Sequence, residues 1–409
     1  MTLREVNRVG EGQKNVPKLR FKGYEDAWEQ RKLGEEVQIV MGQSPKGENY
    51  TDNPEDYILV QGNADMKDGK VFPRVWTTQV TKQAHKGDII LSVRAPVGDI
   101  GKTDYDVVIG RGVAAVKGNE FFYQLLGKLK LDGYWTKSST GSTFDSINSN
   151  EIKNAKVTIP DTNEQLFIGD YFQGLDNLIT LHQRKYDALK SMKKTLLSKM
   201  FPKNGEDVPE IRFKEFTDAW EQRKLGEITE KFEYGLNAAA TDFDGVNQYL
   251  RITDIDDETR EFNKTSLTSP DTNLDSAENY ILKQGDILFA RTGASVGKTY
   301  QYKESDGRVY YAGFLIRARL LSGFNVGFIF QNTLTKRYEN FISITSQRSG
   351  QPGVNAQEYA SFKLLLPKFE EQEKIADLFT NLDNLITLHQ RKLDELKNMK
   401  KTLLQQMFV

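Results

Sequence analysis

The sequence predicts an α+β protein in which two globular mixed α/β domains are separated by two long helices. The first observation is a long repeat, because residues 175–201 and 382–408 are identical at 22 of 27 positions. The second is a shorter repeat, because VPKLRFKGYEDAWEQRKLGE at 16–35 returns as VPEIRFKEFTDAWEQRKLGE at 208–227. Between these near-identical segments the two copies differ strongly, which indicates one duplicated unit with divergent inserts.

These repeats divide the chain into five parts. The long repeats are offset by 207 positions and the short ones by 192, so the second insert is 15 residues longer than the first (207 − 192 = 15). We expect a flexible leader, a first domain, a first spacer helix, a second part that combines linker, repeated opener and second domain, and a second spacer helix. Their bounds are 1–15, 16–160, 161–203, 204–367 and 368–409.

Length and composition exclude several classes of protein. A chain of 409 residues is long enough for two or more cores. It has no Cys and three His, which excludes disulfide frameworks, thiolate zinc sites and Cys nucleophiles and leaves little material for a His-based metal site. No apolar run is long enough to cross a membrane, and residues 1–20 lack the apolar core of a secretory signal. We therefore expect a cytoplasmic protein without a membrane partner.

Each opener reads as a short extended or turn segment followed by a short helical turn that leads into a strand. Trp28 and Trp220 occupy equivalent places in the two copies, and we expect them to pack the opener onto its domain. A net charge of −1 excludes a uniformly basic surface but allows local basic regions.

The two inserts show the same order of predicted elements. β-Branched runs bounded by Gly, Pro and Asp predict strands. In the first insert these runs are DYILVQG, KVFP, GDIILSVRA, VVIGRGVAAV and AKVTIP; in the second they are NQYLRITDI, QGDILFART, VYYAGFLIRARL and KLLLP. Apolar spacing of three and four predicts one helix over 120–131 and another near 326–338.

The repeated segments predict two helices of about 38 residues, or roughly 57 Å each. Apolar residues recur by three and four, so each helix needs a partner, and the other copy is the nearest one. We expect an antiparallel coiled coil within the chain, with pseudo-two-fold symmetry and with His182 and His389 as polar positions of the stripe. The predicted packing residues are Leu175, Leu178, His182, Leu189, Met192, Leu196, Leu382, Leu385, His389, Leu396, Met399 and Leu403, and Ile179, Tyr186 and Met200 widen the stripe.

Catalytic motifs are missing from the sequence. GASVGKT at 293–299 resembles a nucleotide-binding P-loop, but its first Gly stands one position too close to the GKT end. The inserts also lack the Asn/Asp-Pro-Pro-aromatic stretch of base methylation, a nuclease cluster and a positioned His for a Ser-His-Asp triad. We therefore expect neither a catalytic residue nor a metal or cofactor in this chain.

The remaining candidates are polar recognition surfaces. Arg94 and Arg291 stand where a strand runs into a small-residue turn, and an Arg there can reach a phosphate or a guanine. The alternative is that they pair with Asp88 and Asp286. The same turns contain Lys102, Thr292 and Lys298.

Two Ser/Thr/Gly-rich loops and the end of the first strand supply further polar groups. Hydroxyl, amide and guanidinium groups contact phosphates and base edges, although a solvated loop is the alternative interpretation. We align Val60–Asn63 with Arg251–Asp254 as a position that differs between the copies. The candidates are Gln61, Asn63, Lys137, Ser138, Ser139, Thr140, Ser142, Thr143, Arg251, Thr253, Gln347, Arg348, Ser349 and Gln351.

From about Val16 onward this layout resembles the DNA-specificity subunit of type I restriction-modification systems. The features are the two WEQRKLGE openers, the two GDI turns, the Ser/Gly loops that lead to a strand ending in Pro160 or Pro367, and the paired LDNLITLHQRK helices. The resemblance implies that each insert is a target-recognition domain for one half of a bipartite, asymmetric site in double-stranded DNA. It does not transfer base-reading side chains one by one.

The resemblance also implies partners. The helices would set the half-site spacing and dock two modification (methyltransferase) subunits, and through the complex restriction (translocase/endonuclease) subunits. S-adenosylmethionine, ATP and Mg would act on those partners and not on this chain. A stand-alone DNA-binding or scaffolding protein without enzyme partners remains the alternative.

Overall fold

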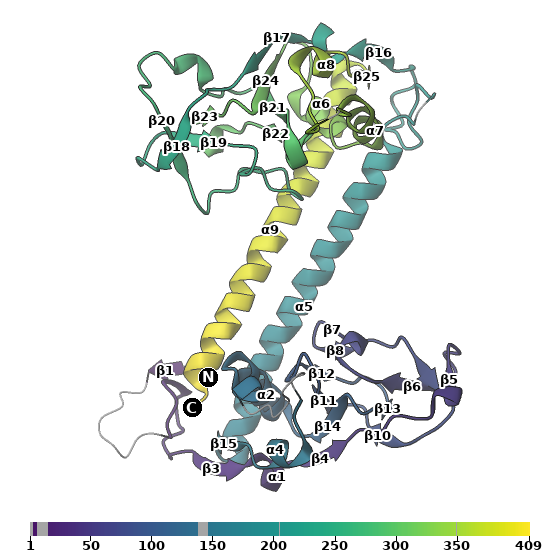
Figure 1. The fold of residues 1–409 in the computed structure, drawn as a ribbon, viewed down its shortest axis with the longest axis vertical. Coiled ribbons are helices and arrows are strands. Elements are labelled where there is room, and N and C mark those ends of the chain that lie inside the picture. Colours follow the sequence, from purple (N-terminus) through teal and green to yellow (C-terminus); the bar gives the residue numbers. More distant parts are fainter. Residues whose placement is uncertain (1–2, 6–14, 138–145, 204, 349) are drawn as a thin grey trace. The chain divides into compact units, whose positions relative to one another are not determined.

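The computed structural model describes residues 3–5, 15–137, 146–203, 205–348 and 350–409. The chain divides into two compact units. Unit 1 contains Met1–Gln183 and Arg391–Val409, and unit 2 contains Arg184–Gln390. Each unit combines short strands and helices with a part of each long helix (Figure 1).

Two mixed sheets form the globular part of unit 1. The six-stranded sheet has the order β4 (Gln38–Met41), β14 (Val113–Lys117), β11 (Ile89–Ser92), β12 (Ile100–Lys102), β8 (Lys70–Val71), β7 (Met66–Lys67). The five-stranded sheet has the order β10 (Lys82–Ala84), β13 (Val107–Ile109), β6 (Tyr57–Val60), β9 (Trp76–Thr77), β5 (Tyr50–Thr51). A separate pair joins β1 (Leu3–Glu5) and β2 (Leu19–Phe21). Every residue of β11 is buried, as its continuous apolar run predicts.

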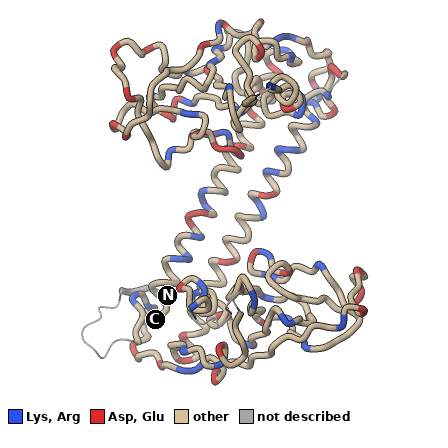
Figure 2. The backbone as a smooth tube through the Cα atoms, viewed as in Figure 1, with Lys and Arg blue, Asp and Glu red and all other residues tan. Residues whose placement is uncertain are grey.

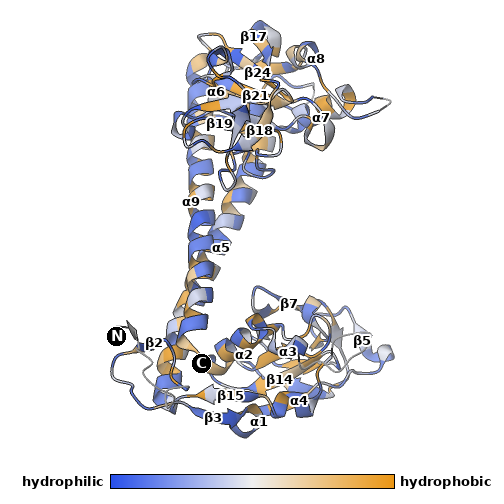
Figure 3. Ribbon diagram, turned by 60° about the vertical axis from the view of Figure 1, so that its left-hand side comes forward, coloured by the Kyte–Doolittle hydropathy of each residue, from blue (hydrophilic) through white to orange (hydrophobic). Residues whose placement is uncertain are grey.

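The helix predicted over 120–131 is confirmed as α2 (Glu120–Leu131). Its first turn is capped by the Asn119 side chain, which accepts a hydrogen bond from the Phe122 amide. Figure 3 shows hydrophobic colouring on α2 and β14 and mostly hydrophilic colouring along the long helices. The shorter helices of unit 1 are α1 (Leu33–Glu36), α3 (Tyr134–Lys137) and α4 (Ser149–Lys153), with 3-10 turns η2 (Gly47–Asn49) and η3 (Asn63–Asp65).

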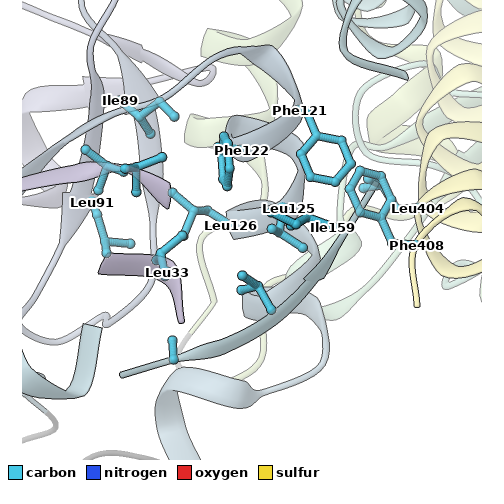
Figure 4. Packing of buried hydrophobic residues seen from close by; sticks show 14 of the residues in the cluster. Leu33, Ile89, Leu91, Phe121, Phe122, Leu125, Leu126, Ile159, Leu404 and Phe408 are labelled. Carbon is cyan, nitrogen blue, oxygen red and sulfur yellow. The ribbon is translucent and has the colours of Figure 1, made fainter. Parts of the chain in front are cut away.

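The opener of unit 1 contains β2 and then β3 (Glu29–Lys32), and β3 pairs antiparallel with β15 (Lys156–Ile159). α1 and β4 follow, in the predicted order of extended segment, helical turn and strand. The indole of Trp28 is 2% exposed, and its ring centroid lies 5.8 Å from that of Phe121 and 6.2 Å from that of Phe408. The prediction that this Trp packs the opener onto its domain is therefore confirmed. Figure 4 shows Phe121, Phe408 and Leu404 facing one another in the core of unit 1.

Unit 2 repeats this plan with smaller sheets. The largest has the order β17 (Thr229–Tyr234), β24 (Leu315–Leu320), β21 (Asp286–Ala290), β22 (Thr299–Gln301). The strand pairs are β18 (Ala239–Asp242) with β20 (Thr268–Asp271), β19 (Gln248–Leu250) with β23 (Val309–Tyr311), and the opener strand β16 (Glu221–Lys224) with β25 (Lys363–Leu366). The 3-10 turns are η4 (Leu225–Glu227), η5 (Glu278–Tyr280), η6 (Gly293–Ser295) and η7 (Glu304–Asp306). Trp220 is 3% exposed and contacts Phe201 and Phe328, as Trp28 contacts Phe408 and Phe121.

The single helix predicted near 326–338 is wrong, because the structure has two helices there. α6 (Val326–Asn332) ends before a short turn, and α7 (Lys336–Thr345) begins after it. The hydroxyl of Thr335 caps α7 by accepting a hydrogen bond from the Tyr338 amide at 3.4 Å. A Thr that bonds the backbone competes with helix continuation, so the apolar spacing alone did not reveal the break. α8 (Ala356–Ala360) follows.

The two long helices are α5 (Thr162–Lys199) and α9 (Phe369–Met407). Within unit 1 they run antiparallel, since Lys400 Nζ lies 2.6 Å from Asp176 Oδ1 and the ring of Phe408 lies near that of Phe172. Within unit 2 the pairing repeats at an offset of 207 residues, with Lys193 Nζ 2.6 Å from Asp383 Oδ1. The antiparallel pairing and the repeat are therefore confirmed within each unit.

The apolar stripe of these helices is shifted from the predicted one at every second position. Leu175 and Leu382 are buried, whereas Leu178, Leu385, Met192 and Met399 are 44–52% exposed, so their predicted packing is wrong. Ile179, Tyr186 and Met200, which were predicted to widen the stripe, lie on the seam itself. In α5 the seam follows Ile168, Phe172, Leu175, Ile179, His182, Tyr186, Leu189, Lys193, Leu196 and Met200, and in α9 it follows the equivalent positions. His182, Leu189, His389 and Leu396 stay on the stripe, and so do Leu196 and Leu403. The sequence is ambiguous because Leu178 and Ile179 are both apolar.

A buried ion pair fastens each opener to the start of a long helix. In unit 1, Arg20 Nε and Nη2 donate to the two carboxylate oxygens of Glu164, each at 2.7 Å. In unit 2, Arg212 and Glu371 form the same two-pronged pair at the same distances. Such a two-pronged pair fixes both the distance and the orientation between the two side chains. Each opener is therefore attached in the same way to the start of the long helix in its own unit. Among the described residues, no helix is long and apolar enough to cross a membrane.

Candidate nucleic-acid interface

The polar candidates of unit 1 come together at a concave surface next to the ends of three strands. β6 leads into Gln61, β11 leads into Arg94, and the turn between β13 and β14 contains Arg111. The cavity has a volume of about 320 Å³. It is lined by Ser44, Tyr50, Gln61, Gly62, Asn63, Ser92, Arg94, Ala95, Arg111 and Gly112. Three of the predicted DNA-binding residues are therefore brought together.

Backbone hydrogen bonds hold this surface in shape. The amides of Gln61 and Gly62 donate to Oδ2 of Asp65, at 2.7 and 3.3 Å. Tyr50 donates its hydroxyl to the Gln61 side-chain oxygen at 3.1 Å. Gly112 has to be a glycine, because a Cβ there would lie 1.9 Å from the Gln61 carbonyl oxygen. The close approach of these two turns creates the wall of the cavity.

The cavity of unit 1 is basic. Arg94 and Arg111 are exposed, and neither guanidinium has an acidic partner among the described residues. The alternative pairing of Arg94 with Asp88 is wrong, because Asp88 Oδ2 accepts from the His85 amide at 2.8 Å and Arg94 lies elsewhere. Arg111 was missed by the sequence interpretation. The sequence feature that could have identified Arg111 is the string Gly110-Arg111-Gly112 between two apolar strands, because two Gly residues around an Arg indicate a tight turn.

Unit 2 has a second and larger cavity at the equivalent place, of about 600 Å³. Its lining is more aromatic and aliphatic than that of unit 1. The lining residues are Tyr234, Gly235, Leu236, Asn237, Ala238, Ala240, Tyr249, Arg251, Ile252, Thr253, Arg291, Ala312, Gly313 and Phe314. Predicted candidates Arg251, Thr253 and Arg291 are brought together there.

Strand register corrects the alignment of the first strand end. Val60 pairs with Ile109 in unit 1, and Leu250 pairs with Tyr311 in unit 2, both in parallel ladders. Val60 is therefore equivalent to Leu250, and Gln61 to Arg251, one position away from the expected match. The segments that follow the first strand in the two copies are too different for the sequence alone to show this shift of one residue.

Arg251 is held by its own loop. Its Nε and Nη2 donate to the Asp254 carboxylate at 2.8 and 2.9 Å, and these hydrogen bonds raise the pKa of Arg251. Thr253 is exposed and also donates to Asp254. The pair closes the turn after β19 as Asp65 closes the turn after β6.

Arg94 and Arg291 do not occupy equivalent positions. Ser92 pairs with Val113, and Ala290 pairs with Leu315, so Arg291 corresponds to Val93 and Thr292 to Arg94. The isolated bridges of Arg94 with Ser146 and of Thr292 with Gly353 support this register. The alternative pairing of Arg291 with Asp286 is wrong, because Asp286 is bound by Arg319 at 2.8 and 2.9 Å.

Lys102 and Lys298 lie away from both cavities and are bound internally. Lys102 pairs with Glu120 and lies 5.2 Å from the ring of Tyr123. Lys298 is 9% exposed and donates to the Ile255 carbonyl at 3.0 Å. The shared GKT string is not equivalent in structure either, since Lys102 pairs with Ile89 whereas Gln301 pairs with Ile287.

The Ser/Thr/Gly loops are described in part. Ser138, Ser139, Thr140, Ser142, Thr143 and Ser349 lie outside the described residues. Lys137 is exposed at the end of α3, and Arg348 is bound to Glu358 at 2.5 Å beside Gln347. Gln351 and its neighbours lie against the Arg291 turn, because Gly293 donates its amide to the Pro352 carbonyl at 3.0 Å.

Comparison with known proteins gives a consistent result. The family model described as "Type I restriction modification DNA specificity domain" matches twice, at residues 25–191 and 217–398. A putative type I restriction enzyme MjaX specificity subunit of Methanocaldococcus jannaschii is 30% identical over 183 residues, which are 42% of this chain and 42% of that protein. The MjaVIII specificity subunit of the same organism is 22% identical over 92% of this chain and 91% of its own length.

A solved structure supports the fold. The type I restriction-modification S subunit from M. genitalium superposes with a TM-score of 0.65, covers 96% of this chain and 99% of that chain, and shares 16% sequence identity. At that identity the likeness concerns the fold alone.

Proposed function

Because the chain belongs to the family of type I restriction-modification DNA specificity subunits, we propose that it recognises a bipartite, asymmetric site in double-stranded DNA. The first domain (16–160) reads one half and the second domain (within 204–367) reads the other. One observation carries this proposal. Cavities bearing Arg side chains lie at the same topological place in both units, yet their lining residues differ. Equal placement with unequal chemistry is what two readers of different sequences require.

The long helices are the proposed spacer and docking element, within 161–203 and 368–409. Near-identical helices offer the same groups twice, which fits two copies of one modification subunit. Each unit has one exposed set of two Leu and one Met: Leu178, Leu181 and Met399 in unit 1, and Leu385, Leu388 and Met192 in unit 2. A contiguous exposed apolar patch marks a protein interaction site, and in this proposal each set forms one such patch. Figure 2 shows several Lys and Arg positions along α5.

The chemistry belongs to the partners in this proposal. S-adenosylmethionine acts on the modification subunits, and ATP and Mg act on the restriction subunits that join through the complex. Among the described residues no group of three His, Asp or Glu side chains is arranged to hold a metal ion. The chain supplies sequence recognition and spacing.

An exchange of one insert tests the proposal. Residues 36–155 are replaced by the corresponding insert of another specificity subunit, and methylated positions are mapped in genomic DNA of cells that express the complete system. We expect one half of the bipartite site to change and the other half, with the gap, to stay. The reciprocal exchange of residues 228–362 is the matched control. A change in both halves, or in neither, contradicts the assignment of one half to each domain.

A further inference from the structure

The guanidinium of Arg291 has an unusual setting at the mouth of the unit 2 cavity. Its Cζ lies 5.0 Å from the ring centroid of Tyr234 and 5.9 Å from that of Phe314. Both rings are themselves exposed, Tyr234 at 43% and Phe314 at 55%. Cation–π contact of this kind orients a planar guanidinium without using its N–H donors.

The backbone on each side of this cluster is fixed. The Arg291 amide donates to the Phe314 carbonyl at 3.0 Å, and the Arg291 carbonyl accepts from the Val354 amide at 2.9 Å. Tyr234 precedes Gly235, where a Cβ would lie 2.2 Å from the Ala312 carbonyl oxygen. The Tyr234 hydroxyl also accepts from the Ala356 amide at 3.3 Å. The Arg is therefore pre-positioned, and little side-chain entropy is lost when it binds a ligand.

The donors of Arg291 are available. Among the described residues, its guanidinium has no carboxylate partner, in contrast to Arg251, Arg317 and Arg319 of the same unit. An Arg held by aromatic rings, with free donors and beside a cavity, fits bidentate recognition of a flat acceptor pair. In the major groove of DNA that pair is O6 and N7 of guanine.

We infer that Arg291 reads one guanine in the half-site of the second domain, an inference that rests on the proposed function. In unit 1 the equivalent position is Val93, which is buried, so the first domain has no counterpart. The inference thus assigns a specific base contact to one reader only. A phosphate contact would position the DNA but would not select a base.

The test uses the chain assembled with its modification subunits. The methylated motif is mapped first, and the half that changes when residues 228–362 are exchanged defines the second half-site. Duplexes are then prepared in which each guanine of that half-site is replaced in turn by 7-deazaguanine, which lacks the N7 acceptor but still pairs with cytosine. We expect the wild-type complex to lose affinity by about tenfold to hundredfold at one guanine.

The Arg291→Ala complex should bind the modified and unmodified duplexes equally at that guanine, and its methylated motif should become degenerate at that position alone. Arg308→Ala is the matched control, because Arg308 is exposed and lies 5.7 Å from the ring of Tyr310 but does not line the cavity. It should keep the wild-type motif.

Three outcomes overturn the inference. The first is a uniform loss of affinity in Arg291→Ala for all duplexes with a salt slope lower by about one, which indicates a phosphate contact. The second is an unchanged motif in Arg291→Ala. The third, which needs no variant, is that no 7-deazaguanine in the second half-site weakens wild-type binding. A wild-type complex that methylates no bipartite site would instead contradict the proposed function.

Discussion

The buried ion pair between Arg20 and Glu164 shows how much depends on single side chains in this fold. The carboxylate of Glu164 is fully buried, and Arg20 is 3% exposed. Glu164 also accepts a hydrogen bond from Trp28 Nε1 at 3.2 Å. In unit 2 the Nε1 of Trp220 has no hydrogen-bond partner among the described residues. The two ion pairs are thus similar in geometry, but only the carboxylate of Glu164 also accepts a hydrogen bond from the Trp of its opener.

We predict that Glu164→Gln destabilises the attachment of the opener by about 3–5 kcal/mol, because it leaves a buried guanidinium without its counter-charge. Hydrogen exchange of the β3 and β15 amides should accelerate locally, whereas that of β16 and β25 should stay unchanged. Glu371→Gln is the mirror control and should act on β16 and β25, with a smaller effect. If either variant accelerated amide hydrogen exchange equally in both units, the prediction that each ion pair stabilises only its own unit would be contradicted.

Residue-level reasoning brought candidates together where neighbouring strands fix their position, and it separated them where two sequence strings merely look alike. Gln61, Asn63, Arg94, Arg251, Thr253 and Arg291 all line the cavities. Lys102 and Lys298 do not, because the Lys102 ammonium pairs with the Glu120 carboxylate and the Lys298 ammonium donates to the Ile255 carbonyl. The register of a strand depends on its partner strands. The sequence alone therefore could not show that Arg94 and Arg291 are offset by one position.

At the scale of elements, the seam of the long helices separates two neighbouring residues into different roles. Ile386 is 7% exposed and Leu385 is 44% exposed. We predict that Ile386→Ala lowers the free energy of unfolding of unit 2 by about 2–4 kcal/mol, as for other buried large-to-small changes. Leu385→Ala should change it by less than about 1 kcal/mol. Urea unfolding followed by circular dichroism measures both.

The same pair tests the docking surface. Leu385→Ala should reduce the amount of modification subunit retained in co-purification, although the chain stays folded. Leu178→Ala, at the equivalent position of unit 1, should act in the same way. If retention is normal in both variants and in the double variant, the exposed Leu positions are not the docking surface.

Elements with strong local signals could be predicted from the sequence. The range of α2 was correct because its apolar spacing and its Asn119 cap agree. The break between α6 and α7 depends on the Thr335 hydroxyl, and Thr299 hydrogen-bonds Thr333 from a distant strand at 2.7 Å. The seam of α5 and α9 is set by which face meets the partner helix, which a stripe of adjacent apolar residues leaves undecided.

At the scale of the whole molecule, both long helices begin in one unit and end in the other. If they space the two readers, their length should set the gap between the half-sites. We predict that seven residues inserted into both helices at paired positions lengthen the gap by about three base pairs, since a heptad adds about 10.5 Å of helix and DNA rises about 3.4 Å per base pair.

Mapping of methylated positions measures the gap, and the half-site sequences should stay unchanged. Insertion in α5 alone is the control, because it breaks the pairing of Lys193 with Asp383 and should abolish methylation. An unchanged gap in a protein that still methylates would show that the helices do not set the spacing.

The end of α9 completes the core of unit 1, and the end of α5 completes the core of unit 2. This arrangement has a consequence for biosynthesis. Phe408 and Leu404 belong to the core of unit 1, yet they are translated after every residue of unit 2. Unit 2 has its full set of residues once Gln390 has left the ribosome, whereas unit 1 keeps an apolar opening beside Trp28 and Phe121 until residues 391–409 arrive. The half made first is thus the last to have its core completed.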